Sequence, residues 1–238
     1  MRNGWAVLVL LLPGFLLGQE QPGPVSPLPE VLAAEGSSPA RSDSGLADPG
    51  DEVGLLQDAG MVHVTGPGVE GFEIDVYEFP NQRGALPRVE VSWEEAAAAC
   101  AARGKRLCSE QEWRRACAGP ANRLYGYGSV FESGRCNTPY QQGDAWRRDH
   151  GLARSGAFPG CASDYGVYDL IGNVWEWTAD RYAGDQDWRV VRGGSWFHNV
   201  NLATSESRYG RYLSPDYRLE LIGFRCCRSA PEPGSPPR

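Results

Sequence analysis

The sequence has few of the residues and spacings that usually identify a metal centre. It contains three histidines and seven cysteines, and only Cys226 and Cys227 lie close together. Structural zinc sites combine four cysteine or histidine ligands, usually in pairs separated by about two to four residues. The scattered ligands of this sequence therefore argue against a zinc site.

A basic surplus is also missing. The net charge of the whole chain is −7, and most of this acidity lies in residues 19–60, which carry eight acidic residues against Arg41. Residues 61–228 carry 20 basic and 21 acidic residues, so this part is nearly neutral. A nearly neutral domain lacks the charge that attracts a phosphate backbone, which argues against nucleic-acid binding.

No apolar run is long enough for a typical transmembrane helix, which needs about 20 residues. Residues 1–18 begin with Arg2 and continue as a shorter apolar stretch that Pro13 interrupts. This pattern predicts a signal peptide cleaved after Gly18, with an uncleaved interfacial helix as the alternative. We therefore expect a secreted or periplasmic protein without a stable membrane span after signal cleavage.

Two segments lack the composition of a folded domain. Residues 19–60 and 230–238 are rich in proline, glycine, serine and acidic residues and poor in aromatic ones. Such segments cannot bury enough apolar surface to offset the entropy lost on folding, so we predict a disordered linker and a disordered tail. Residues 61–229 remain and suit one domain. All the cysteines lie there, and beside a signal peptide they predict disulfides, with at least one thiol left over.

Local patterns in this domain predict two helices and several strands. Segments 92–104 and 109–120 each begin with a serine followed three residues later by a glutamate, which is the capping-box pattern. Alternating apolar residues predict a half-buried strand within 61–79. Strand-like sequence returns in two later segments, 188–197 and 221–229.

The middle of the domain shows no persistent period. Residues 121–187 are rich in glycine, asparagine, aspartate, proline and aromatic residues. Compact domains rarely contain so long an irregular stretch unless something ties it down. Disulfides and a bound ion are the candidates for that role.

A series of motifs resembles the formylglycine-generating enzyme, or sulfatase-modifying factor, family over roughly residues 70–228. In chain order they are GFEIDVYE, VSWEEAAAACAARGKRL, SEQEW, YGYG, RCN, YGVYDLIGNVWEWTAD, RVVRGGSW and GFRC. The resemblance implies an α+β fold, a loop-rich variant of the C-type lectin fold. Two short helices near the N-terminal side and small antiparallel sheets are expected in this fold.

Enzymes of this family oxidise a cysteine of a sulfatase peptide to formylglycine, using O2 and a copper(I) ion held by two thiolates. Thiolates suit copper(I) because this ion prefers soft ligands. Aligned on the GGS motif, His198 and Ala203 occupy the two ligand positions, and neither is a cysteine. His198 could be a lone ligand or simply a polar residue of the surface or cleft. Together with His63 and His150, it forms no readable iron triad.

The resemblance also implies a disulfide between Cys100 and Cys226, which would join the first helix to the last strand. The family's second bridge begins at the position of Cys117, but its partner position holds Arg208, so this bridge is lost or rewired. Adjacent residues of a strand point to opposite faces, so Cys226 and Cys227 should take different partners.

The remaining cysteines allow two further pairs. Cys136 and Cys161 bracket the irregular stretch and form a reasonable pair. Cys108 with Cys227 is a guess by comparison, and it leaves Cys117 free and buried.

In the family, the motif DLIGNVWEW binds Ca2+. The ligands would be a side-chain oxygen of Asp169, the carbonyls of Gly172 and Val174, and the carboxylate of Glu176. Calcium takes six to eight oxygen ligands and accepts carboxylates together with carbonyls, so this set suits it. The alternative is that both acids bond backbone amides without a metal. A second family site, held more weakly, would use Asn137, Thr138, Asp149 and Gly151.

Without the two thiols, we predict a secreted non-catalytic module that calcium and disulfides stabilise. Its cleft would bind an extracytoplasmic peptide, protein or glycan. The candidates for this cleft are Trp196, His198, Asn199, Arg208 and Tyr209. Trp175 and Trp177 are expected to be core packing. The alternatives are a formylglycine-generating oxidase with a non-standard metal site, the one case that would require Cu+, and an oxidase that uses iron.

Overall fold

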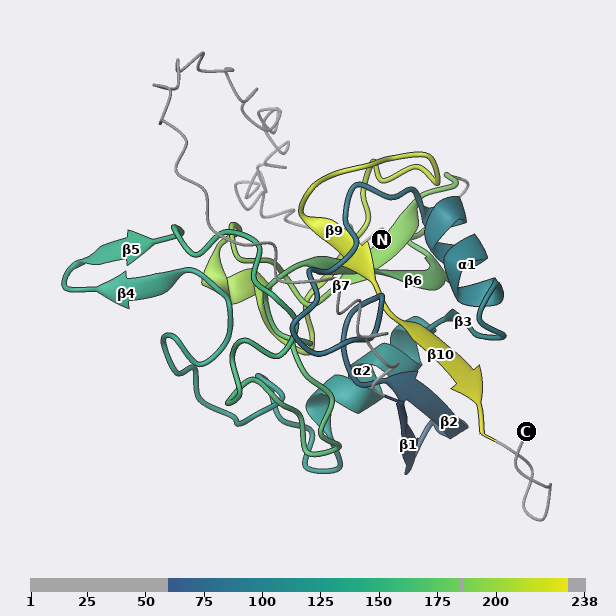
Figure 1. Ribbon diagram of the computed structural model, residues 1–238, viewed down its shortest axis with the longest axis horizontal. Helices are drawn as coiled ribbons and strands as arrows, with labels where there is room; N and C mark the ends of the chain where they lie inside the picture. Colours follow the sequence, from purple (N-terminus) through teal and green to yellow (C-terminus); the bar gives the residue numbers. More distant parts are fainter. Residues whose placement is uncertain (1–59, 185, 231–238) are drawn as a thin grey trace, which may run out of the picture. The chain divides into compact units, whose positions relative to one another are not determined.

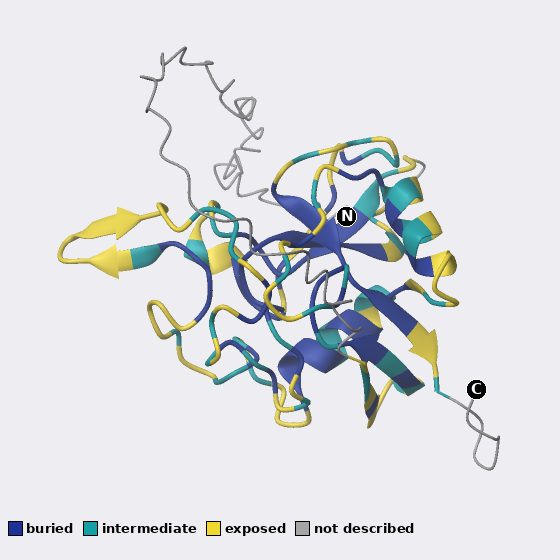
Figure 2. Ribbon diagram, viewed as in Figure 1, coloured by how far each residue is buried: buried dark blue, intermediate teal, exposed yellow. Residues whose placement is uncertain are grey.

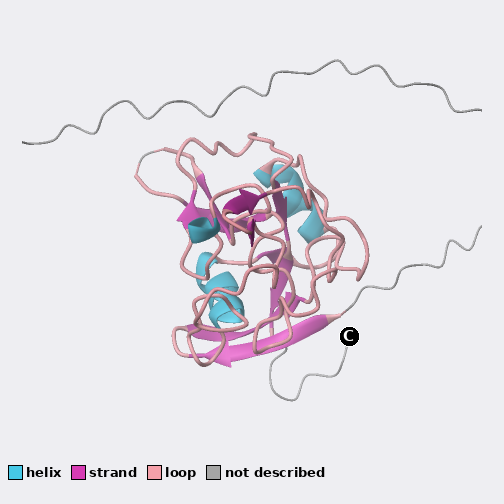
Figure 3. Ribbon diagram, turned by 90° about the vertical axis from the view of Figure 1, so that its left-hand side faces the viewer, coloured by secondary structure: helices cyan, strands magenta, loops and turns pink. Residues whose placement is uncertain are grey.

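The computed structural model describes residues 60–184 and 186–230. The predicted signal peptide therefore lies outside the described residues, as do almost all of the predicted linker and tail. Within the described residues, loops make up most of the chain, and the helices and strands that they connect are short (Figure 3). This arrangement confirms the predicted loop-rich α+β fold.

Both predicted helices begin at their capping boxes. Helix α1 (Trp93–Ala101) follows Ser92, and helix α2 (Glu110–Ala118) follows Ser109; in each, the serine side chain accepts a bond from the third helical amide. The glutamate at that third position bonds back to the serine amide, so two amide donors without helical partners are satisfied. Helix α2 ends at Gly119, whose φ of 68° lies in the left-handed region that glycine tolerates best.

The first sheet joins the two ends of the described domain. Its strand order is β1-β2-β10-β3. The strands are β1 (Met61–Gly66), β2 (Val69–Asp75), β10 (Cys226–Ser229) and β3 (Arg106–Leu107). All of its neighbouring strands are antiparallel. In Figure 1, β10 crosses the domain and runs beside β2, so the C-terminal strand completes a sheet that the N-terminal hairpin begins.

The second sheet supports the candidate site. Its order is β8-β7-β6-β9. The strands are β8 (Arg208–Tyr209), β7 (Arg189–Arg192), β6 (Trp175–Arg181) and β9 (Ile222–Phe224). A short 3-10 helix, η1 (Val200–Leu202), follows β7. Strands β6 and β9 pair in parallel, which corrects the expectation of purely antiparallel sheets.

Strand β6 lies inside the stretch that the sequence presents as irregular. Its first four residues, Trp175–Thr178, are all buried, so neither face of the strand shows the alternation that predicts a half-buried strand. The predicted strand at 188–197 is shorter than expected, because β7 ends at Arg192 before the two left-handed glycines that follow.

The third sheet is the hairpin β4 (Tyr140–Gln142) and β5 (Ala145–Arg147), which pairs with no other strand of the described residues. Figure 1 shows it extending to one side of the described domain, and Figure 2 colours nearly all of it as exposed. It too lies within the irregular stretch of the sequence. Three residue pairs form its ladder.

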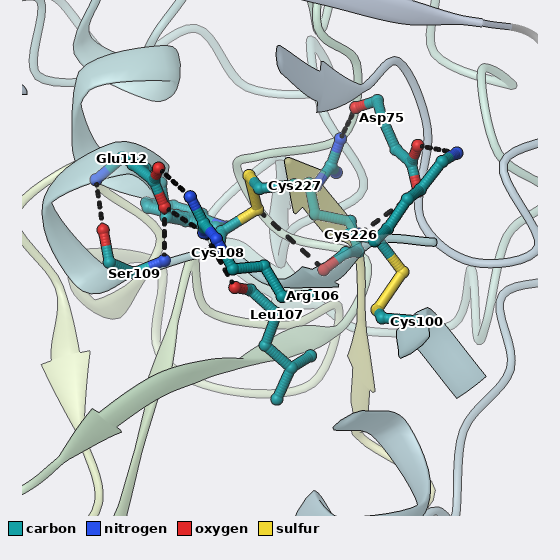
Figure 4. The surroundings of a disulfide bond; sticks show 12 residues. Asp75, Cys100, Arg106, Leu107, Cys108, Ser109, Glu112, Cys226 and Cys227 are labelled. Carbon is teal, nitrogen blue, oxygen red and sulfur yellow. Dashed lines mark hydrogen bonds and ion pairs between the residues drawn. A yellow bond between two sulfur atoms is a disulfide. The ribbon is translucent and has the colours of Figure 1, made fainter. Parts of the chain in front are cut away.

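Three disulfides hold these layers together, and they are the pairs that the sequence predicts. Two of them start from adjacent residues of β10, Cys100–Cys226 and Cys108–Cys227 (Figure 4). The third, Cys136–Cys161, closes the irregular stretch. Cys117 is free and buried, as expected.

A buried ion pair lies beside the first disulfide. Lys105 is the single lysine of the sequence, and its Nζ lies 2.6 Å from Asp75 Oδ1. The other carboxylate oxygen of Asp75 accepts a bond from the Cys226 amide at 3.2 Å. Only 7% of the Lys105 side chain and none of the Asp75 side chain is exposed. Asp75 therefore holds the end of β2 against β10 through the Cys226 amide and against the start of β3 through Lys105.

Candidate functional site

Three carboxylates and one arginine form a buried cluster at the centre of the domain. Glu78, Asp169, Glu176 and Arg225 are each at most 3% exposed. Both carboxylate oxygens of Glu176 accept bonds from Arg225, at 2.7 Å each. Trp113 of α2 donates a further bond to Glu176 at 2.7 Å. The motif residue Glu176 therefore joins β6 to α2 and to the chain just before β10.

The cluster has more negative than positive charge, and its pKa values reflect this. Burial, reinforced by the charge of Glu176, raises the pKa of Asp169 to about 6, although the Gly156 amide and Arg225 oppose the shift. Burial and then the charge of Asp169 raise the pKa of Glu78 well above its ordinary value. Three carboxylates against one guanidinium leave an excess of negative charge in a low-dielectric interior, which disfavours ionisation.

Asn173 connects this cluster to the irregular stretch. Its amide group donates to Glu78 at 2.7 Å, and its oxygen accepts from Asn137 at 2.8 Å and from the Ala153 amide at 3.0 Å. Ser155 donates to the other oxygen of Glu78 at 2.6 Å. These buried bonds, together with the Cys136–Cys161 disulfide, tie down the stretch that lacks regular structure.

The two predicted calcium sites lie against each other. The amide of Asn173 donates to the carbonyl of Asn137 at 2.7 Å. Gly172 has a φ of 81°, and a Cβ at this position would lie 2.2 Å from the same carbonyl oxygen. Only glycine therefore allows the chain of the first predicted site to approach the second so closely.

At the first predicted site, the side chains of Asp169 and Glu176 already have protein partners. Asp169 accepts a bond from the Gly156 amide at 2.7 Å, and Glu176 is held by Arg225. Within the described residues, no three His, Cys, Asp or Glu side chains are grouped to hold a metal ion. A cation here would therefore need the carbonyls of Gly172 and Val174 as well, which is a mixture that calcium accepts.

At the second predicted site, one oxygen stands out. Asn137 Oδ1 is buried and has no hydrogen-bond partner among the described residues. The amide nitrogen of the same side chain donates to the Gly151 carbonyl at 2.9 Å. Asp149 is exposed and accepts a bond from Tyr140 at 2.8 Å. A buried oxygen that accepts no hydrogen bond lowers the stability of the fold. A cation bound to this oxygen would replace the missing donor.

His198 is engaged through one ring nitrogen. Trp175 Nε1 donates to His198 Nδ1 at 3.1 Å, and the Ser195 hydroxyl lies 2.8 Å from the same nitrogen. A neutral ring that accepts at Nδ1 carries its proton on Nε2, so neither nitrogen offers a free lone pair. Burial lowers the pKa of His198, and the charge of Arg148 lowers it further. The geometry therefore fits a neutral hydrogen-bonding residue better than a metal ligand.

The other copper position is a core residue. Ala203 is 1% exposed and belongs to the same buried cluster as the free thiol of Cys117. Burial, and then the charge of Glu176, raises the pKa of the Cys117 thiol far above its ordinary value. A thiol that stays protonated is a poor copper ligand, since metals bind the thiolate. The residues present do not fit the two-thiolate copper site of the family.

Some of the predicted cleft residues meet around Trp175. Its ring centroid lies 5.9 Å from that of His198 and 6.3 Å from that of Tyr209. Trp196 and His198 both pack against Phe197, at 5.5 and 5.9 Å. We call Trp196, Phe197, His198 and Tyr209 the aromatic face. Phe197 and Tyr209 are 49% and 45% exposed, so this face is open to solvent.

The other two predicted cleft residues serve local structure. The Asn199 side chain accepts a bond from the Asn201 amide and caps η1. Arg208 pairs with Glu110 at 2.7 Å and donates to the Tyr182 carbonyl at 2.7 Å. It therefore points to α2 rather than to the aromatic face.

Two hollows are described, and neither lies at the aromatic face. One, of about 230 Å³, lies between the β1–β2 turn and the N-terminus of α2, and its lining includes Glu70, Arg106 and Ser109. The other, of about 10 Å³, lies beside Cys161 and Ser163. The residues of the aromatic face line neither hollow, and this face is open surface.

Sequence reasoning missed Glu78, Asn173 and Arg225. The signal for Glu78 was present, because this acid continues the inward alternation of Phe72 and Ile74. An acid at an inward position is costly unless it is paired, and it often marks a functional cluster.

Comparison with known proteins agrees with this geometry. Residues 61–230 match the family of the sulfatase-modifying factor enzyme 1-like domain. The chain belongs to the sulfatase-modifying factor family. It is 42% identical over 159 residues to the inactive C-alpha-formylglycine-generating enzyme 2 of Bos taurus, covering 62% of this chain and 52% of that protein. It is 29% identical over 170 residues to the formylglycine-generating enzyme of Mus musculus, covering 60% of this chain and 44% of that enzyme.

Solved structures support the fold of this family member. PvdO from Pseudomonas aeruginosa superposes with a TM-score of 0.55 at 19% identity, over 72% of this chain and 92% of that one. The present chain spans about half the length of the curated relatives it matches. Neither described helix has the length or apolar character needed to cross a bilayer.

Proposed function

We propose that this family member is a non-catalytic, extracytoplasmic binding module that calcium and disulfides stabilise. The observation that carries the proposal is the pair of residues at the copper positions. His198 is bonded to Trp175 and Ser195 through Nδ1, and Ala203 is buried in the core. Copper(I) would find no thiolate at either position. The likeness to inactive relatives supports the same conclusion.

The cluster around Glu176 supports a structural role for calcium. Glu78, Asp169 and Glu176 together carry three potential negative charges against the single positive charge of Arg225. A bound divalent cation would balance them. The buried Asn137 Oδ1, which has no partner among the described residues, supports a cation at the neighbouring position as well. Calcium suits both sets because it accepts carboxylate, amide and carbonyl oxygens together.

The aromatic face supports a binding role. Exposed aromatic side chains are over-represented where proteins bind partners, because they bury a large area for little loss of conformational entropy. Arg148 lies over the Phe197 ring at 5.9 Å and adds a positive charge at its edge. This combination suits an extracytoplasmic peptide, protein or glycan, and the three disulfides suit an oxidising compartment.

The purified full chain is expected to bind no copper and to form no aldehyde. The test mixes it with Cu(I), O2 and a peptide containing Cys-x-Pro-x-Arg, and measures aldehyde by mass spectrometry and copper by elemental analysis. The physical reason is the absence of a thiolate pair. Aldehyde formation by the chain would overturn the non-catalytic proposal.

A matched variant makes the copper test sharper. The double substitution H198C/A203C restores thiols at both positions and should bind copper, whereas H198S/A203S should not.

The proposed binding role of the aromatic face is tested with peptide and glycan arrays. Phe197→Ala should weaken the binding of any captured ligand. Leu86 lies on another loop and is equally exposed, at 49%, so Leu86→Ala should leave that binding unchanged. No capture by the unaltered chain, or equal effects of both changes, would count against the aromatic face.

Removing calcium is expected to lower the melting temperature of the domain. A ligand at 100 times its Kd stabilises the folded state by about 2.7 kcal/mol, which corresponds to roughly 5–10 °C for a domain of this size. Scanning calorimetry with calcium and with a chelator measures the shift, and elemental analysis measures the bound ion.

Two exposed acids of the hairpin region separate the second site from general charge effects. Asp149→Asn should reduce the calcium-dependent shift, because this side chain is a predicted ligand. Asp144→Asn removes the same charge from the hairpin turn and should leave the shift unchanged. The calcium proposal is wrong if the chelator leaves the melting temperature unchanged and elemental analysis finds no bound calcium.

A further inference from the structure

The sequence contains three pairs of adjacent basic residues, and the fold treats them differently. They are Lys105–Arg106, Arg114–Arg115 and Arg147–Arg148. The first pair is held by the Lys105 ion pair and by strand β3, and the second lies within helix α2. The third ends strand β5, where every residue from 141 to 150 is exposed.

The hairpin that carries the third pair is only weakly anchored. Its two strands pair with each other through three residue pairs and, within residues 60–184 and 186–230, with no other strand. Trp146 lies 6.3 Å from the Phe131 ring, and Arg148 lies over Phe197. Isolated two-stranded hairpins are marginally stable, so local opening costs little free energy. The Arg148–Asp149 bond lies just beyond the end of β5 in an exposed segment. Exposed, weakly held segments are preferred sites of proteolytic cleavage.

We propose that the β4–β5 hairpin is a processing site, at which an endoprotease specific for paired basic residues cleaves after Arg148. Water adds to the carbonyl carbon of Arg148, and the C–N bond to Asp149 breaks. Arg148 gains a carboxylate, and Asp149 gains a free amino group. Opening the hairpin presents Trp146, Arg147 and Arg148 as the extended strand that a protease cleft requires.

The disulfides determine what cleavage produces. Each of the three bridges joins a cysteine before Arg148 to one after it: Cys100–Cys226, Cys108–Cys227 and Cys136–Cys161. The two fragments therefore stay covalently joined, and the cut lies outside the main sheets. The product is a two-chain protein with the fold retained.

Cleavage also changes the aromatic face. Arg148 is the residue that links the hairpin to Phe197, and its charge acts on His198. After the cut, Arg148 becomes a chain end that is free to leave the Phe197 ring. The aromatic face then loses the positive charge that Arg148 holds at its edge.

The test treats the oxidised full chain with a subtilisin-like endoprotease specific for paired basic residues. We expect one cut, after Arg148, that adds the mass of one water to the intact protein. Gels should show one species without reductant and two fragments with it, and sequencing should place Asp149 at the new N-terminus. Arg148→Gln should abolish the cut. With a chelator present, so that the proposed calcium ligand Asp149 does not contribute, the melting temperature of the cleaved, unreduced protein should stay close to that of the intact one.

The other two basic pairs are the internal control. In the reduced, denatured chain, the protease should cleave after all three pairs, whereas in the folded chain Arg106 and Arg115 should be protected. A folded chain that resists cleavage after Arg148, or is cut first at another pair, would overturn the proposal. So would a denatured chain that resists cleavage after Arg148, or fragments that separate without reductant.

Discussion

Removal of both disulfides that start from β10 is expected to lower the free energy of unfolding by about 7–8 kcal/mol, whereas removal of either one costs only about 2.5 kcal/mol. Cys100–Cys226 and Cys108–Cys227 close loops of 126 and 119 residues that nearly coincide. Either bridge alone keeps the long loop closed, so losing the other reopens a loop of only about nine residues. The second loss then releases the long loop itself, at about 5 kcal/mol.

Urea unfolding of the alanine variants measures these values. The free energy lost with both bridges is comparable to the whole stability of a typical domain, about 5–15 kcal/mol. The variant in which all four of these cysteines are alanine should therefore be largely unfolded. Cys117→Ala is the matched control, since it removes a buried sulfur without removing a crosslink. If removing one bridge lowers the free energy of unfolding as much as removing both, the shared-loop explanation is wrong.

Replacing Arg225 with methionine is expected to lower the free energy of unfolding by about 3–5 kcal/mol. The guanidinium binds Glu176 twice and also donates to the carbonyls of Asp75, Val76 and Tyr168. Methionine fills a similar volume but leaves the buried Glu176 uncompensated. Removing one partner of a buried pair costs more than the pair itself contributes, because the remaining charge stays out of water.

A neighbouring arginine provides the control. Arg228 lies in β10 and pairs with Glu73, but about half of its side chain is exposed. Arg228→Met should change the stability by less than about 1 kcal/mol. Adding Glu176→Gln to Arg225→Met should recover part of the loss, because it removes the uncompensated charge. Equal effects at both arginines, or no recovery in the double variant, would contradict this account of the cluster.

The local signals in the sequence predicted the helices well. Ser92 and Ser109 fix the starts of α1 and α2, because a capping box acts within one helical turn. Of the disulfides, Cys100–Cys226 followed from the family resemblance, Cys136–Cys161 from the bracketing of the irregular stretch, and Cys108–Cys227 was a guess. Each of these inferences uses residues close together in sequence or a pattern already known.

The centre of the candidate site could not be predicted in the same way. Glu78 and Asn173 are 95 residues apart, yet their side chains bond at 2.7 Å. No local period specifies such a contact, since the loops that carry it have no repeating geometry. Arg208 was expected at the cleft, but the side chain pairs with Glu110 of α2. The sequence alone does not specify which acidic side chain an arginine pairs with after folding.

The single lysine has a practical consequence. Its Nζ is buried and bonded to Asp75, so amine-reactive dyes, crosslinkers and coupling resins will find almost no side-chain target on the folded domain. In the folded protein, such reagents should attach chiefly to the terminal α-amine. One uniform, end-tethered product is then expected, and in it the aromatic face and the hairpin remain unmodified.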